Sequence, residues 1–596
     1  MSTRNPSTRH PRHQWPATRS LTRAIAIALA LGSGAAHAAT ITVDADGDGA
    51  PGTFPGACTL RAAIEAANTG APVDGCSAGS LGADAIVFDP ALAGATITLA
   101  AGQLEIFDDL SITGPVAEDA GGIVIDGNAQ SRLLFIEGAT ASEFAVDLTG
   151  MTLTNGRTTN DNEPGGGIHV IRADLTLDHA SVSGNSAEGA GSFGGGVYAR
   201  YGNIEVIDST LSGNSVTAES TFTNGGGIHV SNGDLALTDS MISENTMAGS
   251  LGSAGVGVFM SDGQVTLVGT TVSGNASTAE TFMVGGGAFV RGDLVMTDST
   301  ISGNTIARGE TAGMVVRSPG GSVIISDSIF SENVAEIDGS RVGGGGLSIA
   351  GGVAELTNVE ISNNSMFGGL GYGGGLGLSS VDNAVLTNVT ITGNTSWRSG
   401  GGVFIDDSSV SFVDSTISDN TVSGSTSSRH GGGGVFALFS SQVSFIGSTV
   451  SGNSAPLAGG GISGLGGSQG SSLELVNSTV SGNSSGESGG GIRAGSQLRL
   501  VHSTVANNTA NSGADGISGG QVFLDNSLIV QSGASETACS TQASSHSNTL
   551  ATDSSCTGTG TALADIVLQP LADNGGPTLT HALGPNSVAI EAAGDC

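Results

Sequence analysis

Apolar and polar residues alternate along most of this chain in short segments that recur about every thirty residues. The clearest marker is the phrase S-[TV]-[IV]-S-G-N, which returns twelve times with variations, and an apolar residue stands three places before each asparagine. The asparagines are Asn185, Asn214, Asn245, Asn275, Asn304, Asn333, Asn364, Asn394, Asn420, Asn453, Asn483 and Asn508. A period of this length indicates a repeat architecture, in which stacked asparagine side chains can hydrogen-bond from one repeat to the next.

Each repeat contains three short segments with the two-residue period of a β-strand and none with the period of a helix. One of them follows a glycine run, as in Gly165-Gly-Gly-Ile-His-Val. If the chain coils, each strand pairs in parallel with its counterpart one repeat later, about 4.8 Å away. Parallel crossovers are strongly right-handed. The pattern therefore predicts an all-β protein, a right-handed parallel β-helix (solenoid) of about twelve regular coils.

The ends of such a coil need covers, because a bare end exposes unpaired backbone and apolar core. The segment from Thr59 to Asn68 predicts a short N-terminal capping helix, since Thr59 is a suitable N-cap and the apolar residues share one face. Irregular first coils are expected after it, and the period is lost from about residue 535. The expected divisions are a signal peptide (1–38), an N-terminal cap with irregular coils (39–160), regular repeats (161–534) and a C-terminal capping, anchor-like region (535–596).

One outward row is rich in rings. In the strand after each glycine run, one residue stands between two inward aliphatic neighbours and therefore points away from the core. In five successive repeats this residue is aromatic or histidine: His169, Tyr198, His229, Phe259 and Phe289. We expect these side chains to stack into a solvent-exposed row, joined further along by Phe404 and Phe436. Stacked rings stabilise a sheet, and exposed rings also form a platform for a sugar or a partner protein.

The first 38 residues have the character of an export signal. Five arginines precede the apolar run Ala24–Leu31, and Ala36-His37-Ala38 supplies a cleavage site. All 53 acidic residues but only 13 of the 18 basic ones lie after this segment, so the remaining chain has a formal charge of −40. Such a surface disfavours nucleic acid as a partner. We expect an extracellular or cell-surface protein without a transmembrane span, because no later apolar run is long enough for one.

The five cysteines lie near the two ends of the chain. Export permits disulfides, and no C-x-x-C metal spacing is present. We expect Cys58 to pair with Cys76 and Cys539 with Cys556, with the Cα atoms of each pair within about 7 Å. Cys596 has no evident partner.

Two end motifs resemble those of secreted β-helix proteins. Cys58-Thr-Leu-Arg-Ala-Ala-Ile-Glu-Ala-Ala-Asn resembles the motif of CSLREA-type domains, and Leu571-Ala-Asp-Asn-Gly-Gly-Pro-Thr-Leu-Thr-His-Ala-Leu looks like a choice-of-anchor Q region. The coils are similar to polymorphic outer-membrane protein repeats and to the pectate-lyase-like fold. The resemblance implies a right-handed β-helix outside the cell or on its surface. It implies no catalytic residues, because these proteins share none.

Two acidic features suggest chemistry, and each has a simpler interpretation. Asp44, Asp46 and Asp48 match the start of a calcium loop, D-x-D-x-D-G, but a proline stands where the twelfth-position glutamate belongs. An acidic turn is the favoured alternative to calcium binding. Stacked carboxylates such as Asp298 and Asp327 would suit a sugar-degrading enzyme, yet asparagine and glycine occupy the same turn position in other repeats.

These observations favour a secreted or surface-exposed, non-enzymatic protein that presents an extended binding face, as adhesin-like proteins do. Its expected ligand is an extracellular polysaccharide or a surface protein, with no assigned catalytic residue and no cofactor other than the calcium considered above. The alternative is a polysaccharide-degrading lyase or hydrolase of the pectate-lyase-like fold.

Overall fold

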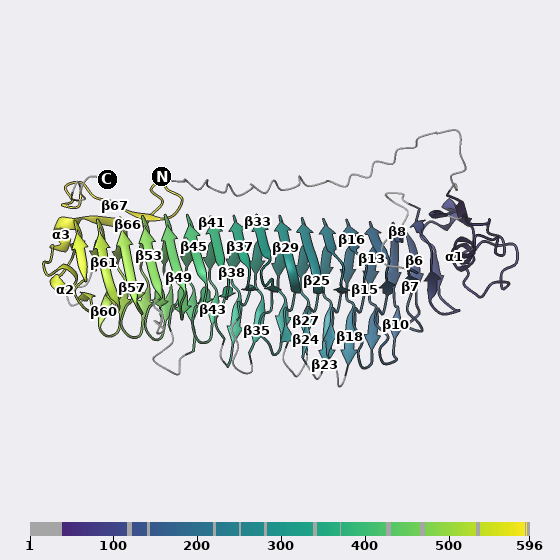
Figure 1. Ribbon diagram of the computed structural model, residues 1–596, viewed down its shortest axis with the longest axis horizontal. Coiled ribbons are helices and arrows are strands. Elements are labelled where there is room, and N and C mark those ends of the chain that lie inside the picture. Colours follow the sequence, from purple (N-terminus) through teal and green to yellow (C-terminus); the bar gives the residue numbers. More distant parts are fainter. Residues whose placement is uncertain are drawn as a thin grey trace, which may run out of the picture.

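The computed structural model describes residues 38–80, 82–115, 122–139, 144–218, 222–249, 252–278, 283–337, 343–369, 371–424, 431–464, 471–531, 537–590 and 592. These residues form one long parallel β-solenoid of about fourteen turns, with the two ends of the chain's described part at opposite ends of its axis (Figure 1). The predicted all-β coil is confirmed. The predicted signal peptide lies almost entirely outside the described residues, as does Cys596.

A representative coil has four strands: β20 (Ile228–Ser231), β21 (Leu235–Thr238), β22 (Met241–Ser243) and β23 (Thr246–Gly249). The sequence predicted the first three, and the structure adds the short fourth strand that follows the asparagine. Each strand pairs in parallel with its counterpart in the next coil, so the described residues form four long columns of strands. We call these four the first-, second-, third- and fourth-strand columns. A short additional column of β19 (Thr223–Asn224), β24 (Ser253–Ala254) and β28 (Met283–Val284) crosses three coils.

The second-strand column runs through nearly the whole molecule. From the first fully regular coil onward its strands are β12 (Asp174–Asp178), β16 (Ile204–Ile207), β21, the second half of β25 (Val258–Val268), the second half of β29 (Ala288–Thr297), β33 (Ser322–Ser326), β37 (Val353–Thr357), β41 (Asn383–Thr387), β45 (Ser409–Val413), β49 (Gln442–Ile446), β53 (Ser472–Val476), β57 (Gln497–Val501), β61 (Gln521–Asp525) and β64 (Ser545–Ser547). In β25 and β29 the first and second strands of the coil continue as one strand.

The twelve asparagines form the predicted ladder inside the coil, and all of them are fully buried. At a typical step, Asn245 Nδ2 donates a hydrogen bond to Asn275 Oδ1 at 2.9 Å, and the backbone N–H of Asn245 donates to the same oxygen at 3.1 Å. The ladder ends where the backbone N–H of Asn508 donates to Gln531 Oε1 at 3.1 Å. The inward aliphatic residues of the first three columns fill the remaining core.

The N-terminal cover is helix α1 (Leu60–Thr69), at the purple end of Figure 1. As predicted, Thr59 is its N-cap, and the Thr59 hydroxyl accepts a hydrogen bond from the backbone N–H of Ala62 at 3.3 Å. The irregular first coils include β2 (Asp84–Phe88), β3 (Thr96–Thr98) and β4 (Leu104–Ile106). The predicted disulfide between Cys58 and Cys76 is present, with a Cα–Cα distance of 4.6 Å.

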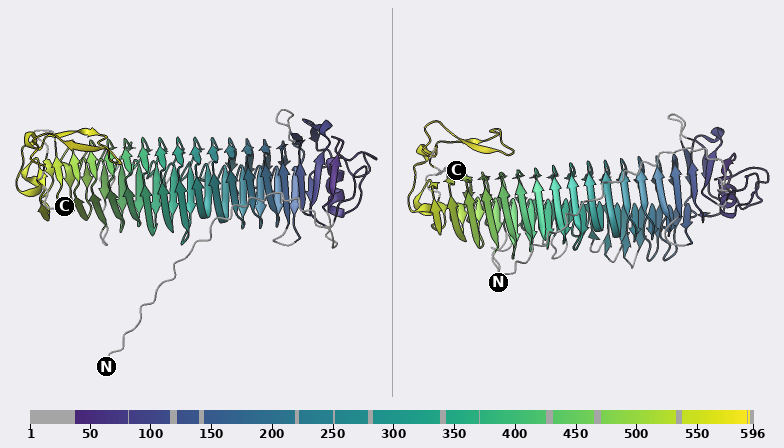
Figure 2. Two further views of the ribbon diagram at one scale, coloured as in Figure 1. Left: turned by 90° about the horizontal axis from the view of Figure 1, so that it is seen from above. Right: turned by 45° about the horizontal axis from the view of Figure 1, so that its top comes forward.

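The C-terminal cover contains the short helices α2 (Ser554–Thr557) and α3 (Leu563–Ile566), and the disulfide between Cys539 and Cys556 has a Cα–Cα distance of 5.0 Å. An antiparallel hairpin of β66 (Leu568–Ala572) and β67 (Thr580–Leu583) turns back along the outside of the last coils, as Figure 2 shows. The hydroxyl of Thr449 donates to the carbonyl oxygen of Leu579 at 2.6 Å and holds the hairpin on the third strands. Within the described part of the chain, no helix has the length and apolar character that crossing a membrane requires.

Candidate functional site

The predicted row of rings exists on the first-strand column. Parallel pairing brings His169, Tyr198, His229, Phe259 and Phe289 into register. Their neighbouring ring centroids lie 5.1, 4.9, 4.6 and 5.3 Å apart in that order. The inner core includes the aliphatic neighbours of these residues but none of the rings, so the rings lie outside the coil as alternation predicts.

The prediction that this row is solvent-exposed is wrong for several members. Only 4% of His229 and 7% of Phe289 is exposed, and Phe404 and Phe436 are buried at 0% and 1%. Other side chains cover these rings: Phe289 packs with Val284 and Val315, and the ring centroids of His229 and Phe193 are 5.1 Å apart. The row is therefore an outer packing layer, and its other three members keep partial exposure.

Burial also sets the charge of the two histidines in this row. Desolvation, assisted by the positive charge of Arg132, lowers the pKa of His169 to about 3. Desolvation likewise lowers the pKa of His229 to about 3, and its Nε2 lies 2.8 Å from the hydroxyl oxygen of Ser231. Both imidazoles are neutral near pH 7 and act as packing rings. Ligand binding by the partly exposed members of the row stays a prediction.

The three acidic residues of the calcium-like motif are Asp44, Asp46 and Asp48. Asp48 accepts two hydrogen bonds from the Arg61 guanidinium at 2.7 and 3.0 Å. Although burial alone raises the pKa of a carboxyl group, these bonds hold the pKa of Asp48 below its usual value. Asp44 accepts a hydrogen bond from the backbone N–H of Cys58 at 2.7 Å, and Asp46 is exposed. Asp44 and Asp48 join the segment after β1 (Thr40–Val43) to the cap, and the three carboxylates do not form a shared set of metal ligands in the described part of the chain.

The stacked acidic residues lie in the turn between the second and third strands of successive coils, and their role there is explained by the geometry of that turn. Asp298 and Asp327 have φ of +51° and +49°, a left-handed conformation that aspartate and asparagine tolerate better than most residues. Among the described residues, Asp178, His179 and Asp208 alone form a trio of possible metal ligands with atoms within 4.8 Å of one another. In that trio the hydrogen bond that His179 donates to Asp178 raises the pKa of His179, and none of the three residues is buried.

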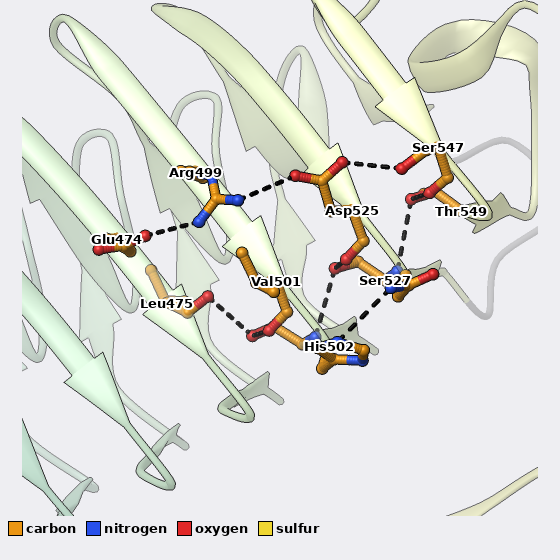
Figure 3. A network of polar contacts seen from close by, with 11 residues as sticks. Glu474, Leu475, Arg499, Val501, His502, Asp525, Ser527, Ser547 and Thr549 are labelled. Atoms are coloured by element: carbon orange, nitrogen blue, oxygen red, sulfur yellow. Dashed lines mark hydrogen bonds and ion pairs between the residues drawn. The ribbon is translucent and has the colours of Figure 1, made fainter. Parts of the chain in front are cut away.

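A different cluster of charged side chains lies on the outer face of the second strands in the last coils (Figure 3). Glu474 on β53, Arg499 on β57 and Asp525 on β61 come from three successive coils. Arg499 Nη1 donates to Glu474 Oε1 at 2.8 Å, and its Nη2 donates to Asp525 Oδ2 at 3.2 Å. The Ser547 hydroxyl donates to Asp525 Oδ1 at 2.8 Å, so the four residues form one polar chain across the strands.

A groove of about 390 Å³ lies along this cluster, and we call it the Arg499 groove. Its lining includes Glu474, Gln497, Arg499, Phe523 and Asp525, and Phe523 is the direct neighbour of Arg499 in the strand pairing. The side chains of Arg499 and Glu474 are 49% and 45% exposed, so their ion pair adds little to stability. A guanidinium, two carboxylates and a ring are groups that bind the hydroxyls and the apolar face of a sugar.

Sequence reasoning missed this groove, although a signal was present. The outward residue at the middle of the second strand is Val385, Ser411 and Ser444 in three earlier coils, and it becomes Glu474 and then Arg499. The change from small to charged residues identifies the site only when the register makes these positions neighbours. The row predicted from the glycine runs concerns the first strands only, and it does not give the register of the second strands.

Comparison with known proteins supports the fold. A model of the right-handed β-helix region matches residues 166–365, 296–469 and 345–555, which together cover well over half of the chain. No curated protein and no solved structure matches the chain. The match agrees with the right-handed sense expected of the parallel coil. The two end motifs lie outside the matched ranges, so their resemblance to CSLREA-type and choice-of-anchor Q regions stays an expectation.

Proposed function

Because this chain belongs to the right-handed β-helix family, we propose that it is a secreted or cell-surface, non-enzymatic protein that binds an extracellular polysaccharide. The binding face is the outer face of the second-strand column. The Arg499 groove carries the proposal, because it is an open groove whose charged groups are about half exposed and lie beside a ring. The export signal predicted for residues 1–38 supports the location.

The rest of this face suits an extended ligand. Upstream of the groove, the outward middle residues are mostly small, aliphatic or hydroxylated, with two glutamates among them, and none is buried: Thr176, Glu205, Ala236, Thr266, Val295, Ile324, Glu355, Val385, Ser411 and Ser444. Successive members are about 4.8 Å apart, so they form a long, even strip. The formal charge of −40 after the signal disfavours a polyanion, and we therefore favour a neutral polysaccharide.

The second candidate is a polysaccharide lyase or hydrolase, because two carboxylates lie beside Arg499. In a glycosidase the two carboxyl groups flank the bond that is cleaved. Here Arg499 bridges Glu474 and Asp525 and occupies the space between them. This arrangement favours binding over hydrolysis.

The experiment measures binding of the protein that lacks residues 1–38 to a mixed-linkage β-glucan, a galactomannan and polygalacturonate, by affinity electrophoresis. Arg499→Gln should weaken binding to a neutral polymer about 10- to 100-fold, because a charge-assisted hydrogen bond contributes about 1.5–3 kcal/mol. Arg157→Gln is the matched control, since Arg157 makes a similar exposed ion pair with Glu188 at 2.8 Å on the fourth strands.

Equal affinity of Arg499→Gln and the unchanged protein would contradict the assignment of the groove. Shortening of a polymer by the unchanged protein, abolished by Arg499→Gln, would replace the binding proposal with the enzymatic one. Chain length of each polymer after incubation is therefore measured in the same samples.

A further inference from the structure

A second concave site lies near the other end of the same face. It is a pocket of about 220 Å³ at the turn between the first and second strands, and its lining includes Phe144, Arg172, Asp174, Tyr201, Asn203 and Asn232. We call it the Tyr201 pocket. Strand pairing leads in eleven steps from Asp174 to Gln497 in the Arg499 groove. At about 4.8 Å a step, the two sites are about 53 Å apart along one face.

The backbone of this pocket is strained. Arg172, Tyr201 and Asn232 have φ of +54°, +61° and +57°. Asparagine adopts this left-handed region readily, whereas a long or aromatic residue there costs on the order of 1 kcal/mol or more. Gly351, with φ of +78°, stands at the corresponding turn of a later coil and avoids that cost. The same turn also has φ of +52° at Phe439 in a later coil, so the left-handed backbone is a property of this turn and not of Tyr201 alone. At Tyr201 this backbone leaves the side chain 43% exposed at the pocket, where a ligand can reach the ring.

Neighbouring side chains hold the pocket in shape. The Arg200 guanidinium carbon lies 4.7 Å from the centroid of the Tyr201 ring, and Arg200 Nη2 donates to the Tyr201 hydroxyl at 3.0 Å. Arg172 Nη2 donates to Glu137 Oε1 at 2.5 Å, and Arg172 Nε donates to the carbonyl oxygen of Gly138 at 3.0 Å. Groups that are already fixed lose little conformational entropy when a ligand binds.

The pocket also offers polar atoms to a ligand. Asp174 Oδ1 accepts a hydrogen bond from the backbone N–H of Asn203 at 2.7 Å, and Asn203 Oδ1 accepts one from the backbone N–H of Asp234 at 2.8 Å. Within the described part of the chain, Asp174 Oδ2 and Asn203 Nδ2 form no hydrogen bond. The pocket therefore combines one free acceptor and one free donor with an exposed ring.

We propose that the Tyr201 pocket binds a single sugar ring of the polysaccharide that lies in the Arg499 groove. A sugar presents an apolar C–H face that stacks on a ring and hydroxyls that both donate and accept hydrogen bonds. The volume of about 220 Å³ is below the 300–1,000 Å³ typical of sites for drug-sized ligands, so it suits one ring. This inference rests on the proposed polysaccharide binding and adds a second, aromatic subsite to it.

The test compares Tyr201→Gly with the unchanged protein that lacks residues 1–38. Binding to the three polymers is measured as above, and a five-sugar fragment of the polymer that binds is titrated in a calorimeter. Because one long polymer occupies both sites and a five-sugar fragment cannot, Tyr201→Gly should weaken polymer binding about tenfold and lower the fragment stoichiometry from two to one. The thermal midpoint should stay the same or rise, since glycine removes the strain. Phe367→Ser is the control, because Phe367 is a similarly exposed ring on the fourth-strand column, 44% exposed.

Unchanged affinity and stoichiometry in Tyr201→Gly, together with weakened binding in Arg499→Gln, would overturn the pocket and leave the proposed function standing. Failure of the unchanged protein to bind any of the three polymers would overturn both. An equal loss of binding in Phe367→Ser would also overturn the pocket, because it would show that the effect is not specific to this face.

Discussion

Replacing Asn304 with alanine should open the solenoid locally without unfolding it elsewhere. The Asn304 side chain is fully buried in the middle of the asparagine ladder. Its Nδ2 donates to Asn333 Oδ1 at 2.9 Å and to the carbonyl oxygen of Val272 at 3.0 Å. Its Oδ1 accepts hydrogen bonds from the backbone N–H and the Nδ2 of Asn275, both at 3.0 Å. Alanine removes all four bonds and leaves their partners buried.

The magnitude follows from these four bonds. A typical intramolecular hydrogen bond contributes about 1 kcal/mol net, so the four together contribute about 4 kcal/mol, and unpaired buried partners raise the cost. Each coil contacts only its neighbours, and the loss should therefore stay within the coils that adjoin Asn304. A loss of about 4 kcal/mol corresponds to a fall of about a thousandfold in hydrogen-exchange protection.

The assay is hydrogen exchange followed by mass spectrometry of peptides, which resolves single coils. Asn388→Gly is the control: Asn388 is exposed, its Nδ2 donates to Asn358 Oδ1 at 2.8 Å, and glycine keeps its φ of +53° without strain. We expect hydrogen-exchange protection in the control to fall by less than about tenfold. Unchanged protection around Asn304, or a loss no larger than that of the control, would refute the reasoning.

Three further outcomes are expected. The pKa of His229 is about 3 in the folded protein and about 6.5 in the unfolded chain, so the free energy of unfolding falls as the pH drops below 6.5, by about 2 kcal/mol at pH 5. In thermal unfolding, His229→Phe should lose less stability between pH 8 and 5 than the unchanged protein does, and an equal loss would contradict this. Removing the disulfide by Cys58→Ser and Cys76→Ser should lower the free energy of unfolding of the N-terminal cap by about 3 kcal/mol. Hydrogen-exchange protection should fall only in the cap, and a fall in the central coils would contradict this prediction. Thr449→Val removes the bond to the carbonyl of Leu579, and protease should then cut the C-terminal hairpin faster while the coils stay intact; an unchanged cleavage rate would show that this bond does not hold the hairpin.

The interior of the fold was predictable because one residue type and one spacing specify it. Asn245 and Asn275 stand one period apart, and that period correctly placed them one above the other. The short fourth strand, such as β23, was not predicted, because it adjoins loops of variable length and has no period of its own. Tertiary pairing with the next coil makes it a strand.

The outer surface was less predictable, because exposure depends on segments that alternation does not describe. His229 was correctly placed outside the coil, yet the side chain of Phe193 packs against it. The Arg499 groove was missed for a related reason. Arg499 and Phe523 are 24 residues apart in a chain whose repeat varies in length, and only the register of the second strands makes them neighbours.

The arrangement of these covers supports the proposal that the binding face lies on the second strands. The outer face of the first strands is covered by side chains such as Phe193, and His229 is only 4% exposed. The hairpin covers part of the third strands, where Thr449 is fully buried. On the second strands, Thr266 and Val295 keep their outward side chains partly exposed. Stability resides in the inner rows and the asparagine ladder, so outward residues of the second strands are free to change with little effect on the coil. The fold does not require Arg499 and Phe523 to lie side by side, and under the proposed function the ligand is the reason for this pairing.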